Sequence, residues 1–168
     1  MSNNHLTDML VSFTKAEVKF IICGGVAAVL HGVERMTLDL DISIDMEQEN
    51  IRRFIRALRE IELEPRIPIP SETLLDPGKI RTLIEEKNAR VFTFADRDKP
   101  WKQVDIFLTE DYSYNRLLSD SVTIKIAGYP MLVISKERLI LMKQAVRPLR
   151  SKDALDISEL LRQRGKSQ

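Results

Sequence analysis

The sequence has a single cysteine, no long apolar run and almost no net charge. Cys23 alone cannot build an intramolecular disulfide framework, and its isolation is typical of a reducing compartment. No stretch approaches the roughly 20 apolar residues of a membrane span, and the first residues lack the basic flank and apolar core of a signal peptide. Because Lys and Arg number 26 against 25 Asp and Glu, nucleic-acid binding through bulk charge is disfavoured. We expect a cytoplasmic protein without a membrane association.

Glycine is also scarce, and its arrangement excludes two common nucleotide sites. Neither G-x-G-x-x-G nor G-x-x-x-x-G-K-[ST] occurs among the six glycines, so a Rossmann or P-loop site is disfavoured. The 168 residues suffice for one domain that needs no disulfide or structural metal. We expect a single domain over 1–168, with a core over about 5–135 and a helical tail over about 136–163.

Hydrophobic periodicity predicts an alternation of helices and strands. Apolar stripes predict helices over 5–16, 26–32, 47–62, 79–87, 136–147 and 151–163. Continuous or alternating apolar runs predict strands over 18–23, 38–44, 90–95, 103–108, 122–126 and 131–134. The proline-rich segment 65–77 reads as a loop that can include a strand edge. This order predicts an α/β (α+β) fold with a small mixed sheet, flanking helices and a helical C-terminal segment.

Two carboxylates lie on the polar face of the predicted strand 38–44. Asp39 and Asp41 alternate with Leu40 and Ile42, so both side chains project from one face, a few ångströms apart. Such a pair repels itself, and one member is pushed toward protonation. A divalent cation removes that cost, and Mg²⁺ suits the pattern because it binds one or two carboxylates together with water and phosphate oxygens.

A third carboxylate, Asp105, stands on the polar face of the predicted strand 103–108. Beside the first pair it can hold a second metal ion and help deprotonate an attacking hydroxyl. A solvated strand face is an equally good interpretation of Asp105 taken alone. We therefore predict that Asp39, Asp41 and Asp105 are metal-binding and catalytic residues, with two Mg²⁺ ions.

Gly24 and Gly25 follow a predicted buried strand and precede a predicted helix. Without side chains, this turn lets the backbone approach a phosphate closely, although a tight strand-to-helix turn would use the same residues.

These residues resemble the nucleotidyltransferase superfamily with the polymerase-beta-like fold. Its pattern is Gly-Gly or Gly-Ser, a short helix, Asp-x-Asp on the next strand and a later Asp on a strand, as at Gly24-Gly25, Asp39-Leu-Asp41 and Asp105. The longer string G-G-x-A-x-x-x-H-G-x-x-R-x-T-x-D-x-D is similar to the AbiEii-type toxin nucleotidyltransferases and their uncharacterised bacterial relatives. The likeness covers about residues 5–162 and implies the nucleotidyltransferase fold.

The helical tail extends this resemblance, because Lys143-Gln-Ala-Val-Arg147-Pro-Leu-Arg-Ser-Lys152-Asp153-Ala-Leu-Asp156 is similar to the K-x-x-A-x-R-x-x-x-K-D-x-x-D segment of that branch. In that branch the matching Lys and Asp belong to the active site, which implies Lys143 near a triphosphate and Asp153 holding Lys143 or polarising the acceptor. An inter-helix salt bridge between Lys143 or Arg147 and Asp153 or Asp156 is the structural alternative.

Three further residues are candidates for nucleotide binding: Arg35, Thr37 and Arg147. Arg35 can pair with a phosphate or lie at the surface of a turn, and Thr37 can cap that turn or face the site. Trp101, between Lys99 and Lys102, can stack on a base, although a lone tryptophan at a turn more often packs locally.

The two ends of the chain differ in charge. Residues 1–45 have a net charge of −3 and residues 136–168 have +5, which suits a metal-bound polyphosphate beside a second anionic partner or simply two solvated faces. We predict a Mg²⁺-dependent enzyme that moves a nucleoside monophosphate from ATP or another nucleoside triphosphate to an acceptor. The resemblance implies a tRNA 3′ end, a protein side chain or a small molecule as acceptor, and an antitoxin as partner. A non-catalytic module that binds nucleotide or partner is the alternative.

Overall fold

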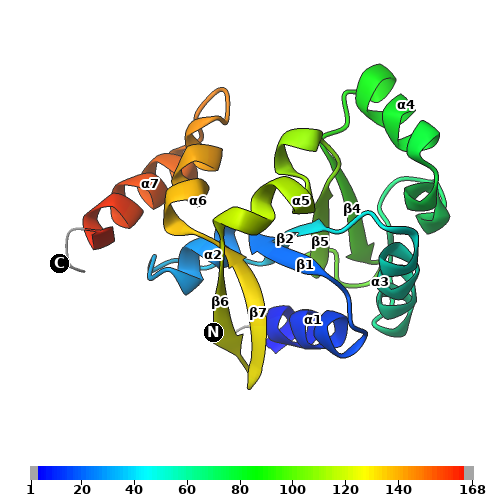
Figure 1. Cartoon of the computed structure of the whole chain (residues 1–168), viewed down its shortest axis with the longest axis horizontal. Coiled ribbons are helices and arrows are strands. Elements are labelled where there is room, and N and C mark those ends of the chain that lie inside the picture. Colours follow the sequence, from blue (N-terminus) through cyan, green and yellow to red (C-terminus); the bar gives the residue numbers. More distant parts are fainter. Residues whose placement is uncertain (1–3, 165–168) are drawn as a thin grey trace.

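The computed structural model describes residues 4–164, which fold around one mixed sheet of seven strands (Figure 1). The strands are β1 (Phe20–Cys23), β2 (Asp39–Ile44), β3 (Leu63–Pro65), β4 (Val91–Asp96), β5 (Gln103–Phe107), β6 (Ser121–Ile126) and β7 (Tyr129–Ile134). The α-helices are α1 (Asn4–Lys15), α2 (Gly24–Leu30), α3 (Gln48–Glu60), α4 (Pro77–Lys87), α5 (Tyr114–Leu117), α6 (Lys136–Gln144) and α7 (Ser151–Arg164).

The strand order is β3-β4-β5-β2-β1-β7-β6. Two pairs, β1 with β7 and β2 with β5, are parallel, and the other neighbours are antiparallel. The predicted mixed sheet with flanking helices is therefore confirmed. Because β2 and β5 are neighbours near the centre of the sheet, the two strands that carry the predicted carboxylates lie side by side.

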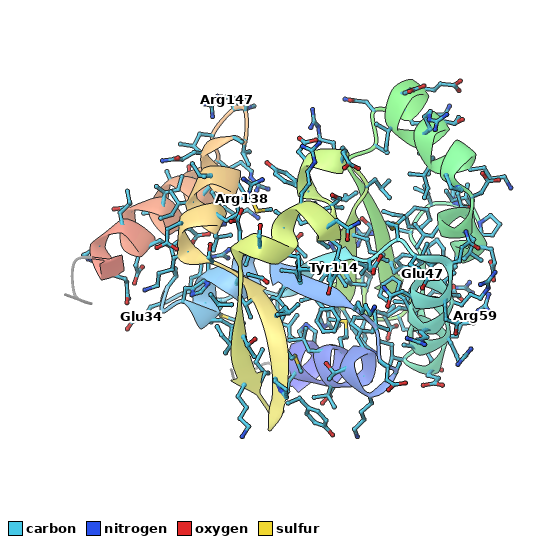
Figure 2. The ribbon with its side chains drawn as sticks, viewed as in Figure 1. Glu34, Glu47, Arg59, Tyr114, Arg138 and Arg147 are labelled. Atoms are coloured by element: carbon cyan, nitrogen blue, oxygen red, sulfur yellow. The ribbon has the colours of Figure 1, made fainter. Side chains whose placement is uncertain are left out.

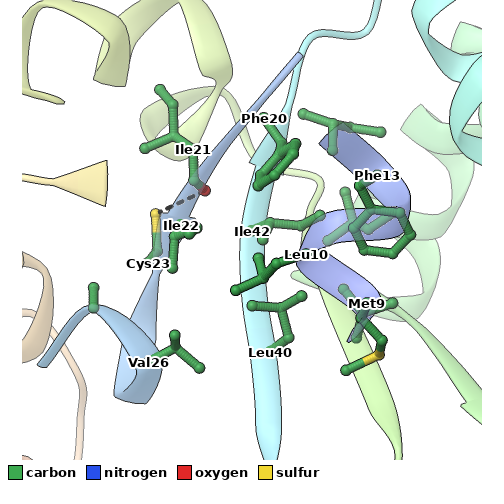
Figure 3. Packing of buried hydrophobic residues seen from close by; sticks show 14 of the residues in the cluster. Met9, Leu10, Phe13, Phe20, Ile21, Ile22, Cys23, Val26, Leu40 and Ile42 are labelled. Atoms are coloured by element: carbon green, nitrogen blue, oxygen red, sulfur yellow. Dashed lines mark hydrogen bonds between the residues drawn. The ribbon is translucent and has the colours of Figure 1, made fainter. Parts of the chain in front are cut away.

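The part of the hydrophobic core shown in Figure 3 lies between the sheet and the helix α1, and the same core includes buried residues of α2, α3 and α6. The predicted apolar stripe of α1 is fully buried, and so are all four residues of β1. Met9, Leu10 and Phe13 pack toward Leu40 and Ile42 of β2 in Figure 3. The buried face of β2 is thus held by apolar contacts, which leaves its aspartates on the other face.

Several boundaries differ from the sequence-based expectation. The helix expected from residue 26 begins at Gly24, directly after β1, so the two glycines are its first residues. The helix expected to reach residue 147 ends at Gln144, because the residue before a proline, here Arg147 before Pro148, disfavours helical backbone. Helix α4 begins at Pro77, two residues early, since Asp76 caps it by accepting from the backbone N–H groups of Gly78 and Lys79.

The connections contain short elements that periodicity did not reveal. The edge strand β3 ends at Pro65, the first residue of the proline-rich segment, and the 3-10 helix η1 (Ser71–Leu75) lies within that segment. The segment after β5 holds η2 (Glu110–Tyr112), the single-turn α5 and η3 (Leu118–Asp120). These pieces are too short for a periodic pattern to be recognised.

Helices α6 and α7 lie together at one end of the molecule, and α3 and α4 lie at the other (Figure 1). Ser135 begins α6 as its cap by accepting from the N–H of Arg138. The residues before 4 and after 164, including the ends of the expected domain range 1–168, lie outside the described residues. Among the described helices, none is long and apolar enough to cross a membrane.

Candidate active site

The three predicted carboxylates come from two neighbouring parallel strands. In the register of β2 and β5, Asp41 is paired with Asp105 and Asp39 with Gln103. Since alternate residues of a strand share a face, Asp39 and Asp41 project from one face of β2, and Asp105 projects from the same face of the sheet beside Asp41. Tertiary structure therefore brings together the carboxylates that lie 64 positions apart in the sequence.

The environment of Asp41 disfavours its negative charge. Burial is the largest cause, and the charges of Asp105 and Asp39 add to it, so the pKa of Asp41 is raised to about 6. The ammonium groups of Lys143 and Lys152 offset part of this effect. Mutual repulsion of this kind is what the alternating sequence predicted, and a bound cation would relieve it.

The environment of Asp105 also disfavours its negative charge. Burial raises the pKa of the Asp105 carboxyl, and the charge of Asp39 raises it further, while a hydrogen bond from the Thr93 hydroxyl acts in the opposite direction. Thr93 lies opposite Asp105 on the antiparallel neighbour β4. That hydrogen bond fixes one oxygen of Asp105 and leaves the other available.

The two glycines serve different contacts. Gly24 has a φ of +60°, and a Cβ built on it would lie 2.1 Å from Oδ2 of Asp41. A side chain on Gly25 would instead meet the Arg35 guanidinium at 2.6 Å and the Thr37 hydroxyl at 2.8 Å. Only glycine allows the end of β1 to pass this close to the Asp41 carboxylate.

A cavity of about 490 Å³ opens beside Asp41. Its walls come from the end of β1, from β2 and β5, and from α6, α7 and the loop between them. Five predicted site residues line it, namely Gly24, Asp41, Lys143, Arg147 and Asp153. Asp39 and Asp105 are not among the lining residues, although their charges act on Asp41.

Lys143 extends from α6 into a buried cluster of charges. Its ammonium lies 2.8 Å from Oδ2 of Asp156 and 3.3 Å from Oδ1 of Asp153, both on α7. Lys143 is 6% exposed, and both carboxylates are 1% exposed or less. The salt bridge that was the structural alternative is therefore present, and it includes both aspartates at once.

Two arginines complete this cluster. Arg150 donates to Asp153 at 2.6 Å, and Arg35 lies 2.9 Å from Asp156. Burial alone would raise the pKa of the Asp153 carboxyl, but the hydrogen bond from Arg150 and the charge of Lys143 outweigh it and hold this pKa below its usual value. Three cations thus neutralise two buried carboxylates.

The remaining candidates lie at the margins. Arg147 stands in the exposed loop between α6 and α7 (Figure 2), where its guanidinium donates to the carbonyls of Gln144 and Val146. Arg35 lines a second, smaller hollow of about 300 Å³ beside α7. Thr37 lies before β2, and its hydroxyl is 3.4 Å from the carbonyl of Asp39. Neither Arg35 nor Thr37 lines the larger cavity.

Sequence reasoning missed four polar or aromatic residues of the larger cavity: Arg90, Phe107, Tyr112 and Arg150. Phe107 carried a usable signal, because it follows Asp105 by two positions and so shares its face. Arg150 precedes α7 by one residue, which places a cation within reach of Asp153 three positions on. Tyr112 lies in a connection where no periodicity exists, and Arg90, expected to begin the strand 90–95, lies one residue before β4.

The donor set fits Mg²⁺ with a phosphate ligand. Within residues 4–164, no three His, Cys, Asp or Glu side chains already stand at metal-ligating spacing. Mg²⁺ does not require such a cage, because it takes one or two carboxylates and fills its shell with water and phosphate oxygens. Asp41, whose charge is opposed by Asp39 and Asp105, is the oxygen ligand with most to gain from a cation.

The structure is similar to several solved nucleotidyltransferases. The lincomycin-bound lincosamide antibiotic adenylyltransferase LnuA is 19% identical, with a TM-score of 0.63 over 96% of this chain and 97% of that one. The antibiotic-resistance factor ANT(2'')-Ia is 14% identical, with a TM-score of 0.61 over 97% and 84%. The nucleotidyltransferase TM1012 of Thermotoga maritima is 15% identical, with a TM-score of 0.53 over 97% and 91%. At these identities the likeness shows the fold.

Sequence comparison reaches further. No curated protein matches the chain. The family described as "Nucleotidyl transferase AbiEii toxin, Type IV TA system" matches residues 8–168, which is nearly the whole sequence. That match includes the glycine turn, the three aspartates and the Lys143 cluster. The chain is therefore a nucleotidyltransferase and belongs to the AbiEii toxin family of type IV toxin–antitoxin systems.

Proposed function

We propose that this enzyme transfers a nucleoside monophosphate from a nucleoside triphosphate to an acceptor, with release of pyrophosphate and dependence on Mg²⁺. The observation that carries the proposal is the cavity in which Asp41 and Gly24 face Lys143, Arg147 and Arg150. A triphosphate needs carboxylates that hold metal ions on one side and cations on the other.

Each part of the cavity has a task in this reaction. Asp39, Asp41 and Asp105 would hold two Mg²⁺ ions, which supply positive charge for the leaving pyrophosphate and align the attack. Lys143, Arg147 and Arg150 line the side where the β- and γ-phosphates would lie. Asp105, on the strand beyond β2, would accept the proton of the attacking hydroxyl.

The acceptor is a hydroxyl on a tRNA 3′ end, a protein side chain or a small molecule. The toxin family supports a cellular acceptor and an antitoxin partner. The solved structure of ANT(2'')-Ia contains adenylyl-2''-tobramycin, which is an adenylylated small molecule. Incubation with each labelled triphosphate and total tRNA, cell lysate or aminoglycosides separates these classes by the size of the labelled product.

The test of the donor reaction is calorimetric. We expect Mg²⁺ and a nucleoside triphosphate to bind together, and expect Asp39→Asn and Asp41→Asn to abolish that binding while the proteins stay folded. Unchanged affinity in both variants would refute the metal assignment. If the wild type binds Mg²⁺ and triphosphate but releases no pyrophosphate with any acceptor, the non-catalytic binding module is the better conclusion.

A further inference from the structure

Two aromatic side chains form part of the larger cavity without any role in the chemistry described above. Phe107, the last residue of β5, and Tyr112, at the end of η2, both line the cavity and are half-buried. Their rings pack edge to face, with centroids 5.3 Å apart and planes at 65°. Both side chains pack against the hydrophobic core on one side and line the cavity on the other.

The position of this pair is fixed relative to the carboxylates. Phe107 follows Asp105 by two residues on β5, so the two side chains share a face about 7 Å apart along the strand. The carbonyl of Tyr112 accepts a 2.7 Å hydrogen bond from the hydroxyl of Ser43, two residues after Asp41 on β2. The aromatic pair is therefore anchored to both strands that carry the predicted metal ligands.

The sheet order gives the cavity a direction. Gly24 directly follows β1 on one side of β2, and Phe107 ends β5 on the other side. A nucleotide whose α-phosphate lies at Asp41 and whose outer phosphates lie toward Gly24 and Lys143 extends its other end toward β5. What arrives there is the sugar and base of the donor, or the end of the acceptor.

Other groups in the lining of this cavity also suit a flat ring. Three apolar side chains line the same cavity: Leu139 and Met142 from α6, and Val146 from the loop that follows it. Arg90 also lines it, and its guanidinium has no ion-pair partner among residues 4–164. Aromatic faces, apolar side chains and one free guanidinium are the groups on which bases stack.

We propose that Phe107 and Tyr112, with Arg90 beside them, form the subsite that binds a nucleobase. The inference rests on the proposed function, because the direction of the cavity follows from placing the triphosphate at Asp41. The ring belongs to the incoming nucleoside triphosphate or to the terminal nucleotide of an RNA acceptor. Both sources share the same stacking chemistry.

The experiment compares ligands with and without a base. Calorimetry with Mg²⁺ would measure the affinities of ATP, CTP, GTP, UTP, tripolyphosphate and single-stranded trinucleotides for the wild type, Phe107→Leu and Tyr112→Leu. We expect both variants to lose about tenfold in affinity for the base-containing ligand that binds best, and to keep their affinity for tripolyphosphate. Tyr112→Phe should bind like the wild type, since its ring remains.

Matched outcomes separate the two sources. A loss limited to nucleoside triphosphates assigns the subsite to the donor base, and a loss limited to trinucleotides assigns it to the acceptor base. Trp101→Leu is the control, because Trp101 is an exposed aromatic residue outside the cavity, and it should change neither affinity.

Two results would overturn the proposal. Equal losses for tripolyphosphate would show that Phe107 and Tyr112 only shape the cavity, and unchanged affinity for every base-containing ligand would show that they bind no base. If the wild type fails to bind Mg²⁺ with tripolyphosphate at all, the triphosphate site itself is wrong. That last result would contradict the proposed function and this inference with it.

Discussion

The negative charge of Asp41, which a metal ion would need, lowers the stability of the folded protein in the absence of metal. Its pKa is raised to about 6 by burial, Asp105 and Asp39, so the folded state binds this proton more tightly than the unfolded chain does. Because the folded state binds more protons between about pH 4 and 6, the contribution of Asp41 to stability is full below about pH 4, declines as the pH rises and is lost above about pH 6.

Asp41→Asn should remove the loss of stability that the ionisation of Asp41 causes above about pH 4. We expect the variant and the wild type to be about equally stable at pH 4, and the variant to be more stable at pH 7 by up to about 2 kcal/mol in the absence of metal. Urea denaturation in EDTA at several pH values measures the difference. Asp8→Asn, an exposed carboxylate on α1, controls for the removal of one negative charge, and a difference that stays constant from pH 4 to 7.5 would contradict the prediction.

Gly24 and Gly25 should respond differently to the same substitution. Gly24→Ala places a methyl group against Asp41 on a left-handed backbone, so we expect a loss of at least about 2 kcal/mol in stability. Gly25→Ala, the matched control, meets the flexible end of Arg35 and the Thr37 hydroxyl and should cost about 1 kcal/mol or less. Denaturant unfolding measures the stability of both variants. Equal stabilities would show that a side chain on Gly24 does not clash with Asp41 as the structure indicates.

The residue pattern predicted part of this site and not the rest. Alternation in 38–44 was enough to place Asp39 and Asp41 on one face, because the strand period is a local property. The pairing of Asp41 with Asp105 depends on which strands are neighbours, and nothing in either strand specifies that. The left-handed backbone is at Gly24, a distinction that two adjacent glycines in a sequence do not reveal.

Helix α7 is attached to the molecule by an unusual stripe. Asp153, Asp156 and Leu160 are its buried residues, at spacings of three and four, whereas Leu155 and Leu161 are exposed. The helix therefore docks through two buried carboxylates, one buried leucine and the partly buried Ile157. Its far end is held by a hydrogen bond from Gln163 to the carbonyl of Gly32. Charge pairing rather than apolar area positions α7 beside the cavity.

Lys143 has a structural task as well as its proposed contact with the triphosphate. Lys143→Ala leaves Asp153 and Asp156 buried near each other with less compensation, so we expect the free energy of unfolding to fall by about 3 kcal/mol. Asp156→Ala in the same protein should recover part of this loss, with a coupling energy of about 1–3 kcal/mol in a double-mutant cycle followed by urea denaturation.

The control for that cycle lies on α7, the helix that carries Asp156. Arg162→Ala removes an exposed cation paired with Glu159 at spacing i,i+3, and its effect should stay within about 0.5 kcal/mol. Full stability of Lys143→Ala would show that the cluster is not cooperative. An active but destabilised Lys143→Ala enzyme would restrict Lys143 to the salt bridge and remove it from the proposed chemistry.

Elements were predicted best where they are long and bury one face. The stripe of α1 and the alternation of β2 are complete patterns, and both elements are where the sequence placed them. The end of α6 was missed because apolar Val146 continues the pattern while the backbone turns before Pro148. Asp156 remained one of two candidate partners of Lys143, since the relative rotation of two helices is set by tertiary packing.

At the scale of the whole molecule, the acidic N-terminal part and the basic C-terminal part of the sequence both contribute residues to one cavity. Asp41 of β2 and the basic residues of α6 and the following loop line the same cavity, and the charge of Asp39 acts on Asp41 from beside it. Opposite charges across one cavity favour a ligand that carries both metal cations and phosphates. The helical tail therefore completes the site, although it lies about 100 positions after the aspartates of β2.

The tail should also be necessary for folding. Leu139, Ile140 and Met142 of α6 and Leu160 of α7 are buried in the same apolar cluster as Val26 of α2. A fragment of residues 1–135 would lose these contacts and expose the face of α2 that packs on α6, which costs about 2 kcal/mol for each large side chain involved.

We therefore expect the fragment 1–135 to lack a cooperative thermal transition, because several such losses are comparable to the net stability of a typical domain. Circular dichroism melting and the dispersion of its NMR amide signals measure this directly. The control is a chain that ends at residue 164, which keeps α7 and should melt like the full protein. A fragment 1–135 that melts cooperatively would show that the sheet and its first helices fold alone, and that the cation wall of the cavity is an addition to a finished core.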